Sequence, residues 1–271
     1  MAYLLNTVNF DNYDIIPGHI TGSNIAIKGA FDMPARIGDT FHDWGDEDGY
    51  ELYTEADELF FGGRDIIFEG HITGGRSAIY TALQGLYSNI AAASGLSVFS
   101  TPYGDFNVLP KSATPKHYNG LSTLKIEFRE PVPDLTGGSV PASGTSNYTI
   151  DGVPMASFGL YASEYDGVIG LPESKQQFFT QIEKEGYQVS KRKANEIDFT
   201  GLLIADDLDA FKTNIKNLYA LFSSAGERTI NLRNQVSIVG IPAEGFKVTK
   251  VLVSAFVIAE LNMKLLASSI T

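Results

Sequence analysis

The chain contains two copies of one sequence pattern, and this internal repeat limits its fold more than any other feature. Each copy has an alternating apolar segment that ends in glycine, Arg64–Gly70 in the first and Asn195–Gly201 in the second. A helical pattern follows, with apolar residues at i, i+4, i+7, i+8 and i+11, which lie on one face of a helix. These positions are Ile79, Leu83, Leu86, Tyr87 and Ile90 in the first copy, and Phe211, Ile215, Leu218, Tyr219 and Phe222 in the second.

The match continues upstream of the two apolar segments. Met33-Pro34 corresponds to Leu171-Pro172, and Gly49-Tyr50 corresponds to Gly186-Tyr187, with six extra residues of the first copy in the range 52–63. One such agreement is common by chance, whereas four in the same order are not. The sequence therefore predicts a tandem duplication, whose two similar outer surfaces suit pseudosymmetric assembly better than a single catalytic cleft.

The repeat divides the 271 residues into two domains. Residues 1–131 are expected to form copy one, with an N-terminal arm or edge strand, and residues 148–271 copy two. Residues 132–147 are rich in proline, glycine and serine, which is typical of a linker. At this size each copy can bury its own core.

Short β-type runs separated by glycine, proline and asparagine predict an antiparallel β-sandwich or barrel in each copy. One helix interrupts the strands of each copy, so the predicted class is mainly β, or α+β, with a single flanking α-helix per domain. The expected strands include Asn24–Lys28, Ile66–Phe68, Ser97–Phe99, Leu124–Phe128, Ser157–Tyr161, Tyr187–Val189, Ile197–Phe199, Val236–Val239 and Val248–Ile258.

The charge balance limits the partners. A net charge of −12 argues against binding nucleic acid through phosphate contacts, which needs clustered Lys and Arg. The basic run Lys191-Arg192-Lys193 is interpreted as a solvated strand or turn. An acidic surface does suit a wall past which DNA slides without sticking, because like charges repel.

Several classes of site are excluded or unsupported. The chain has no cysteine, so disulfides, thiolate catalysis and zinc ribbons are excluded. The first residues lack a basic segment with an apolar core, so we expect no secretory signal. The apolar stretch Val251–Ala267 is interrupted by Glu260, Asn262 and Lys264, which predicts a buried strand and no membrane span.

No catalytic motif is present in the sequence. The four histidines do not pair at metal-ligand spacing, and there is neither a Gly-x-Ser-x-Gly elbow nor a phosphate-binding loop. Gly74–Ser77 is interpreted as a turn before a helix, with Ser77 near the N-cap. We therefore expect no enzymatic activity and no cofactor. The histidines are His19, His42, His71 and His117.

The acidic segment Asp39–Glu51 contains the first candidate site. Asp46, Asp48 and Glu51 surround Gly49 and weakly resemble a calcium loop, but the twelve-residue pattern is incomplete, so a solvated turn is favoured. Trp44 is the only tryptophan of the chain. It is either a packing anchor at a partner surface or a core residue, and both interpretations stay open.

The extra residues of copy one contain the second candidate. Phe60 and Phe61 are adjacent, so they point in opposite directions if the segment is extended. One of them then needs cover from outside its own sheet, either within the chain or from a neighbouring subunit. Together with Trp44 and Tyr50, they are the predicted assembly residues.

The order of these elements resembles that of the distal tail proteins of long-tailed bacteriophages and of related tail-tube and baseplate-hub domains. In copy one the resemblance is carried by Pro34, the run Phe41–Gly49, the strand ending at Gly70, the Leu86-Tyr87 helix and the strand Leu124–Phe128. Copy two matches more loosely through Phe158-Gly159, Pro172, Gly186-Tyr187, Gly201 and Leu218-Tyr219. The resemblance covers nearly the whole chain. It implies packed antiparallel sheets flanked by a helix, and a structural ring at the tail tip of the virion.

One departure from the family affects the expected assembly. The commoner distal tail protein joins one tube-like domain to a different C-terminal domain, whereas both halves of this chain look tube-like. Three chains would then make a ring of six similar domains, or six chains a double-layered ring. The implied partners are further copies of the chain and the tail-tube, baseplate, hub and receptor-binding proteins, assembled in the host cytoplasm. DNA would only pass through, and no membrane partner is implied.

Two other classes remain open. An adhesin built from tandem β-sandwiches would share the composition, but it should carry an export signal and an anchor. A carbohydrate-binding or carbohydrate-cleaving module would need an exposed aromatic platform beside paired carboxylates. The loop with Trp44 and Tyr50 is the candidate for such a platform, and copy two keeps only the tyrosine.

Overall fold

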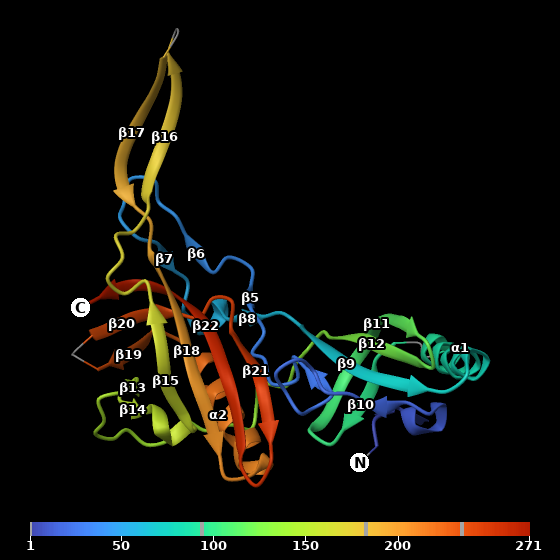
Figure 1. Ribbon diagram of the computed structural model, residues 1–271. Helices are drawn as coiled ribbons and strands as arrows, with labels where there is room; N and C mark the ends of the chain where they lie inside the picture. The colour runs from blue at the N-terminus through green and yellow to red at the C-terminus, as the bar shows by residue number, and fades with distance from the viewer. Residues whose placement is uncertain (1, 93–94, 182–183, 234–235) are drawn as a thin grey trace.

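The computed structural model describes residues 2–92, 95–181, 184–233 and 236–271, and it is built mainly of β-strands (Figure 1). Two eight-stranded antiparallel sheets are each accompanied by one α-helix. The predicted mainly-β class and the single helix of each copy are therefore confirmed. None of the helices in the described ranges is long and apolar enough to cross a membrane.

The first sheet is formed before residue 131. Its strand order is β2-β1-β10-β11-β12-β9-β3, and β4 also pairs with β9. The strands are β1 Leu4–Leu5, β2 Val8–Asn9, β3 Ile16–Pro17, β4 Ile27–Lys28, β9 Arg64–Thr73, β10 Ser97–Thr101, β11 Gly104–Tyr118 and β12 Leu121–Glu130, with helix α1 at Arg76–Ala92.

The second sheet repeats this topology. Its order is β14-β13-β19-β20-β22-β18-β15, and β21 also pairs with β22. Strands β20 and β21 pair with successive parts of β22, as the single long strand β11 pairs with β12. The elements are β13 Thr149–Ile150, β14 Val153–Pro154, β15 Leu160–Asp166, β18 Asn195–Ala205, α2 Leu208–Phe222, β19 Arg228–Leu232, β20 Val236–Ile241, β21 Phe246–Val253 and β22 Val257–Ile270.

Two glycines show that the equivalence extends to the local backbone. Gly29 and Gly167 have φ angles of +84° and +87°, and a Cβ there would lie 2.1 Å from the Asp65 oxygen and 2.3 Å from the Glu196 oxygen, respectively. Only glycine tolerates both demands. Met33-Pro34 and Leu171-Pro172 follow these glycines at the same interval, which supports the match predicted for the two dipeptides.

The edge hairpins are also equivalent, a feature that the sequence analysis missed. Asn6 and Asp151 have φ angles of 52° and 51° in the turns β1–β2 and β13–β14. The side-chain oxygen of Asn6 accepts a hydrogen bond from the Val98 amide at 2.8 Å, and that of Asp151 accepts one from the Thr229 amide at 2.7 Å. The expected N-terminal arm or edge strand thus forms a hairpin at the edge of the first sheet.

The two helices bury the apolar faces that the periodicity predicts. In α1 the buried residues are Ile79, Leu83 and Leu86, while α2 buries all five predicted positions and Leu221. Helix α2 begins after Asp207, whose carboxylate caps it by accepting a hydrogen bond from the Ala210 amide at 2.7 Å. Truncating one such core leucine to alanine costs about 2–5 kcal/mol.

Each copy also has an excursion between its edge strand and its central strand. In copy one the short pairs β5–β8 and β6–β7 form an irregular hairpin, and in copy two the longer pair β16–β17 projects away from the sheet (Figure 1). Gly186 lies inside β17 opposite Phe179, whereas Gly49 lies in the turn before β7, so these two glycines are not equivalent. The strands are β5 Arg36–Ile37, β6 Phe41–His42, β7 Glu51–Leu52, β8 Phe60–Phe61, β16 Ser174–Gln181 and β17 Lys184–Arg192.

Three predicted strands are wrong in their bounds. The expected strand Val248–Ile258, and the apolar stretch Val251–Ala267, both cross a turn between β21 and β22, where the Ser254 amide donates to the Phe256 oxygen at 2.9 Å. The expected strand Ser157–Tyr161 begins in a 3-10 helix, Met155–Phe158. Gly159, with a left-handed φ of 65°, ends that helix before β15.

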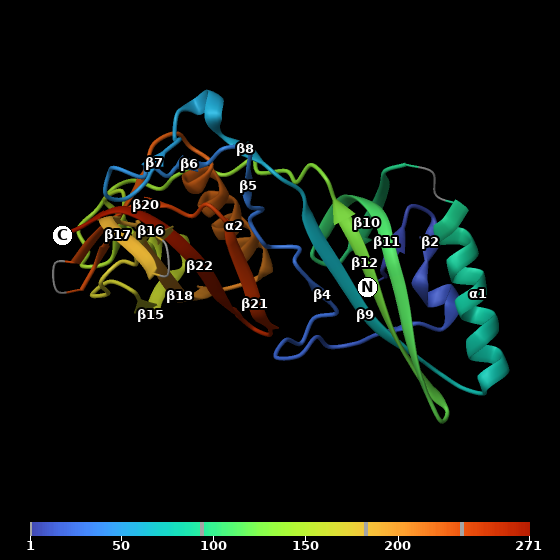
Figure 2. The ribbon, with the colours of Figure 1, turned by 90° about the horizontal axis from the view of Figure 1, so that it is seen from above.

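The two copies are arranged head to tail. Helix α2 lies between the second sheet and the first copy, whereas α1 lies on the far side of the first sheet (Figure 2). Both helices thus flank the corresponding side of their own sheets. One helix is covered by the other copy, and its equivalent lies at the end of the molecule.

Candidate functional site

The main contact between the copies is a segment of copy one that adds to an edge of copy two. Residues 29–36 run beside β21, where the Met33 amide donates to the Phe246 oxygen at 2.9 Å and the Val248 amide donates to the Asp32 carboxylate at 2.8 Å. Phe31 packs edge-on against Phe211 of α2, with ring centroids 5.0 Å apart. We call residues 29–34 the docking segment and the space between α2 and β21 the filled groove. The contact therefore combines isolated main-chain hydrogen bonds at the edge of β21 with buried side chains.

Arg64 fixes the docking segment from the first sheet. Its Nε donates to the Glu130 carboxylate at 2.6 Å. Its Nη1 donates to the main-chain carbonyl oxygen of Asp32 and to the Tyr219 hydroxyl, both at 2.8 Å. The Tyr219 hydroxyl in turn donates to the Asp32 oxygen at 3.1 Å. Arg64 and Glu130 are both buried. The guanidinium therefore links β9, β12, the docking segment and α2 in one network.

The electrostatics of this network follow from its burial. Burial raises the pKa of Tyr219 to about 12, although the nearby Arg64 acts in the opposite direction. Burial also raises the pKa of Glu130, and the ion pair with Arg64 opposes that shift. Loss of one partner would leave an uncompensated buried charge and would lower the free energy of unfolding by about 3–5 kcal/mol.

The loop with Trp44 and Tyr50 forms the second contact between the copies. Trp44 is 45% exposed, so it does not serve as a core residue, and its Nε1 donates to the Glu51 carboxylate at 2.8 Å. Tyr50 stacks on Phe41 with ring centroids 4.5 Å apart. The two predicted aromatic residues thus belong to one loop, but their rings pack on different partners.

Lys175 of copy two occupies the centre of this loop. Its ammonium donates to the backbone oxygens of Trp44, Glu47 and Gly49 at 2.6, 2.9 and 3.0 Å, and it forms an ion pair with Asp43. It also lies 5.6 Å from the centre of the Tyr50 ring. The ammonium is thus surrounded by oxygens of the same acidic loop, but not by the carboxylates of Asp46, Asp48 and Glu51 that resembled a calcium site. Within the described ranges, no group of three or more His, Asp or Glu side chains could hold a metal ion.

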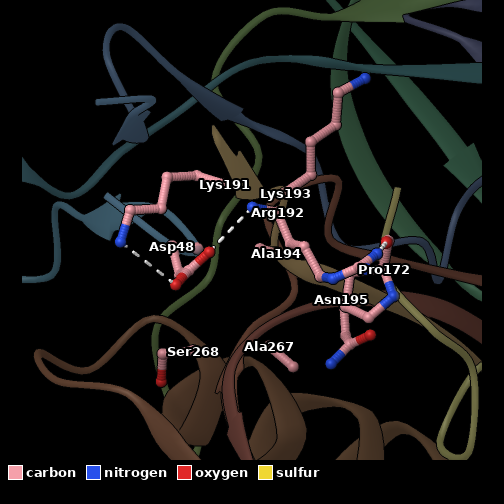
Figure 3. Close-up of a pocket in the computed structure, with 10 residues that line it drawn as sticks. Asp48, Pro172, Lys191, Arg192, Lys193, Ala194, Asn195, Ala267 and Ser268 are labelled. Carbon is pink, nitrogen blue, oxygen red and sulfur yellow. Dashed lines mark hydrogen bonds and ion pairs between the residues drawn. The ribbon is translucent and has the colours of Figure 1, made fainter. Parts of the chain in front are cut away.

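A shallow pocket lies at the base of β17, beside this loop (Figure 3). Asp48 accepts a hydrogen bond from the Arg192 amide at 2.8 Å and pairs with Lys191 at 3.6 Å. The hydrogen bond from Arg192 is the main reason why the pKa of Asp48 is lowered. The basic run 191–193 thus serves partly to hold the acidic loop, in addition to lying at the surface.

Phe60 and Phe61 point in opposite directions, as the sequence predicts. Phe61 packs against the hydrophobic core, whereas Phe60 is 59% exposed. Phe61 therefore finds its cover within the chain. Phe60 remains the candidate for contact with a neighbouring subunit.

The sequence analysis missed the residues that join the copies. Arg64 and Tyr219 belong to the repeated elements, and Lys175 follows the repeated Leu171-Pro172, but none of them was assigned a role. One signal was available: Arg64 corresponds to Asn195, so a charged residue of one copy has no charged equivalent in the other. A polar change inside a repeated strand indicates that the two positions face different surroundings.

No protein-family model matches the sequence, and neither does any curated protein. Among solved structures, the crystal structure of SPP1 Dit (gp 19.1) aligns with 97% of this chain and 98% of its own, with a TM-score of 0.38 and 11% identity. That protein is described as a paradigm of the hub adsorption apparatus in phages that infect Gram-positive bacteria. The alignment spans both chains almost completely, at low backbone similarity.

Proposed function

We propose that this chain is a structural, non-catalytic protein of a bacteriophage tail tip. In this role it forms a ring that joins the tail tube to the baseplate and the host-recognition apparatus. Its place is in the virion, with assembly in the host cytoplasm. Its partners are further copies of itself and the neighbouring tail-tube, hub and receptor-binding proteins.

The head-to-tail junction between the copies carries this proposal. The docking segment of copy one enters the filled groove of copy two, and the duplicated topology supplies a second segment and a second groove. Contacts of this heterologous type generate rings when the rotation closes. Three chains would give six similar domains, and six chains would give a double-layered ring.

The charge of the chain fits passage of DNA without binding. With a net charge of −12, the protein presents a surface that repels phosphates, so DNA would slide through a channel of this ring. Phe60, 59% exposed, and Trp44, 45% exposed, are available on the outside for neighbouring tail proteins.

The alternative is a carbohydrate-binding or adhesin-type module of tandem β-domains. The specific observation that favours it is the exposed indole of Trp44 next to the carboxylate of Glu51. The stacking of Tyr50 on Phe41 opposes it, because that ring is already occupied on one face.

The test is the mass and symmetry of the purified full chain, by light scattering and electron microscopy. Rings of three or six chains with a central hole are the expected result, together with no retention of duplex DNA at physiological salt. A protein that stays monomeric and binds glycans in a Trp44-dependent manner would overturn the proposal in favour of the carbohydrate-binding module.

A further inference from the structure

We propose that residues 167–172 of copy two dock into a groove between α1 and β11 of a second copy of this chain. This inference deepens the proposed ring, because it identifies the two surfaces that meet between chains. We call residues 167–172 the free segment and the space between α1 and β11 the open groove. The contact would repeat between chains the junction that the docking segment makes within the chain.

The open groove is the unoccupied equivalent of the filled groove. It is a hollow of about 380 Å³ lined by Tyr87 and Ile90 of α1 and by Pro110, Ala113 and others of β11. Ala113 corresponds to Phe246 by strand register. Ala113 pairs with Ile126, which pairs with Phe68. Phe246 pairs with Met263, which pairs with Phe199, the equivalent of Phe68. In copy two the same position forms the main-chain hydrogen bond to Met33.

An unpaired hydroxyl marks the open groove as incomplete. Tyr87 and Tyr219 are equivalent, and Tyr219 exchanges hydrogen bonds with Arg64 and Asp32. The hydroxyl of Tyr87 is buried and has no hydrogen-bond partner, one of two such side-chain groups in the described part of the chain. Buried polar groups are normally paired, so an acceptor on a docked segment would satisfy this hydroxyl.

The free segment has the apolar residues that the open groove requires. Gly167 corresponds to Gly29, so Ile169 corresponds to Phe31 and Leu171 to Met33. Phe31 and Met33 are buried at 7% and 3% exposure, whereas Ile169 and Leu171 are 99% and 77% exposed. Two neighbouring apolar side chains with such exposure are expected to be covered in an assembly.

The polar groups of the two junctions change together. In the filled groove the Asp32 carboxylate accepts a hydrogen bond from the Val248 amide. The equivalent positions between chains are Gly170, which has no carboxylate, and Pro115, which has no amide hydrogen. Neither partner is therefore left with an unpaired group. The Gly170 carbonyl, equivalent to that of Asp32, is the acceptor expected for the Tyr87 hydroxyl.

The free segment and the open groove lie at opposite ends of the molecule. The trace between β15 and β16 runs on the side of the second sheet away from copy one, and α1 lies at the other end (Figures 1 and 2). One chain therefore cannot satisfy both surfaces by itself. A head-to-tail neighbour is the occupant whose surface is complementary at each end.

Site-specific cross-linking tests the contact directly, because the chain has no native cysteine. A Leu171→Cys chain mixed with a Ser112→Cys chain should give a covalent dimer with a short bis-maleimide, since Ser112 lines the open groove and is exposed. The double variant should give a ladder that ends at the number of chains in the ring. A Val132→Cys chain, with a residue that is 80% exposed elsewhere, replaces Leu171→Cys as the matched control and should give no dimer.

A complementation experiment tests the polarity of the contact. An Ile169→Asp/Leu171→Asp chain keeps its groove, and a Ser112→Tyr chain keeps its segment. Either variant alone should lose at least about tenfold in self-association, the first because a carboxylate is unfavourable in an apolar groove and the second because the larger side chain fills the groove. Mixed, they should form a heterodimer of one chain each and nothing larger. Unchanged assembly of the double aspartate variant, against a Val132→Asp control, would contradict the inference.

The outcomes separate this inference from the proposed function. Rings of the wild-type chain without the 171–112 cross-link overturn the inference and leave the ring proposal standing. A cross-linked ladder that grows into open filaments supports the inference and overturns the closed ring. Absence of the cross-linked dimer at the highest soluble concentration overturns the inference even where no ring forms.

Discussion

The two tyrosines at equivalent places in the duplicated helices have different surroundings. Tyr219 is buried between the copies, where its hydroxyl bonds to Arg64 and Asp32. Tyr87 is half-buried, and its hydroxyl has no partner. The duplicated fold places a tyrosine at the same position of both helices, but the neighbouring copy supplies hydrogen-bond partners to only one of the two hydroxyls. Comparing the two helices therefore separates the contacts that each domain makes within itself from the hydrogen bonds that form only at the junction between the copies.

Replacing Arg64 should have the largest effect on this comparison. We expect Arg64→Met to lower the free energy of unfolding by about 3–5 kcal/mol, because Glu130 would stay buried without its partner. Asn195→Ala, at the equivalent position of copy two, should change it by no more than about 0.5 kcal/mol in the isolated chain. Urea unfolding followed by circular dichroism measures both. Equal effects at the two positions would show that the junction contributes no special stability.

The equivalence of the copies predicts matched losses at two glycines. Gly29→Ala and Gly167→Ala should each lower stability by about 1–3 kcal/mol, since both combine a positive φ with a backbone oxygen within 2.3 Å of the new Cβ. Gly38→Ala is the control, because its φ is +82° but nothing lies within 4 Å. Thermal unfolding ranks the three. If Gly38→Ala cost as much as the others, the close backbone approach would be irrelevant.

The tyrosine pair gives a smaller and opposite result. Tyr219→Phe should cost about 1–2 kcal/mol, because it removes a hydrogen-bond partner of buried Arg64. Tyr87→Phe should be neutral or slightly stabilising in the isolated chain, since it removes a buried hydroxyl without a partner. Chemical denaturation of both variants tests this. A cost for Tyr87→Phe at concentrations where the chain is monomeric would indicate a partner within the chain.

The raised pKa of Tyr219 adds a pH dependence. A tyrosine with a pKa of about 12 in the folded state and 10 in the unfolded state contributes stability below pH 10 that is lost as the pH rises toward 12. Between these values the stability of the wild-type chain should therefore fall more steeply than that of Tyr219→Phe. Unfolding midpoints measured across this range check the difference. Parallel curves would show that Tyr219 ionises normally.

The smallest expected effect on global stability is at Lys175. Lys175→Met should change the free energy of unfolding by less than about 1 kcal/mol, because its partners lie in an exposed loop where water can replace the ammonium, although the Lys175 side chain itself is only 9% exposed. It should nevertheless alter the fluorescence of Trp44, the only tryptophan, because the ammonium holds the Trp44 carbonyl. Lys193→Met, which loses only an exposed pair with Glu173, is the control and should leave the emission unchanged.

Periodicity within one copy predicted the fold well, because the buried faces of α1, β9 and β18, and part of that of α2, are determined by contacts within a copy. The positions of α2 that contact copy one, Phe211 and Tyr219, belong to the same periodic pattern, so periodicity could not distinguish the junction from the core. Residues 23–24 and 31–36 contact copy two, although they come before most of copy one in the sequence. The role of Lys175 was hidden because its partners are backbone oxygens, which exist at every residue. The acidic segment Asp39–Glu51 was interpreted as a solvated turn, and its charge pattern gave no reason to expect a lysine of copy two at its centre.

The bounds of β21 and β22 show a second limit. The segment Val248–Ile258, which is apolar except at Thr249, Lys250 and Ser254, is compatible with one long strand or with two strands joined by a tight turn. The turn at Ser254 contains neither glycine nor proline, so composition gave no reason to place it there. The pairing of Val253 with Val257 is a property of the folded sheet, set by packing on both sides of the run.

The large sequence separation between the residues that join the two copies affects when the junction can form during synthesis. Asn24 binds Val253, a residue 229 positions later in the chain. At about 5–20 residues per second, a ribosome needs roughly 10–45 s to complete that stretch. During this interval the docking segment, with Phe31 and Met33, has been synthesised, but the α2 and β21 residues that cover it have not. A finished neighbour has its own filled groove occupied and offers only its open groove, so we expect slow synthesis to favour contact of this segment with that groove over closure within the chain.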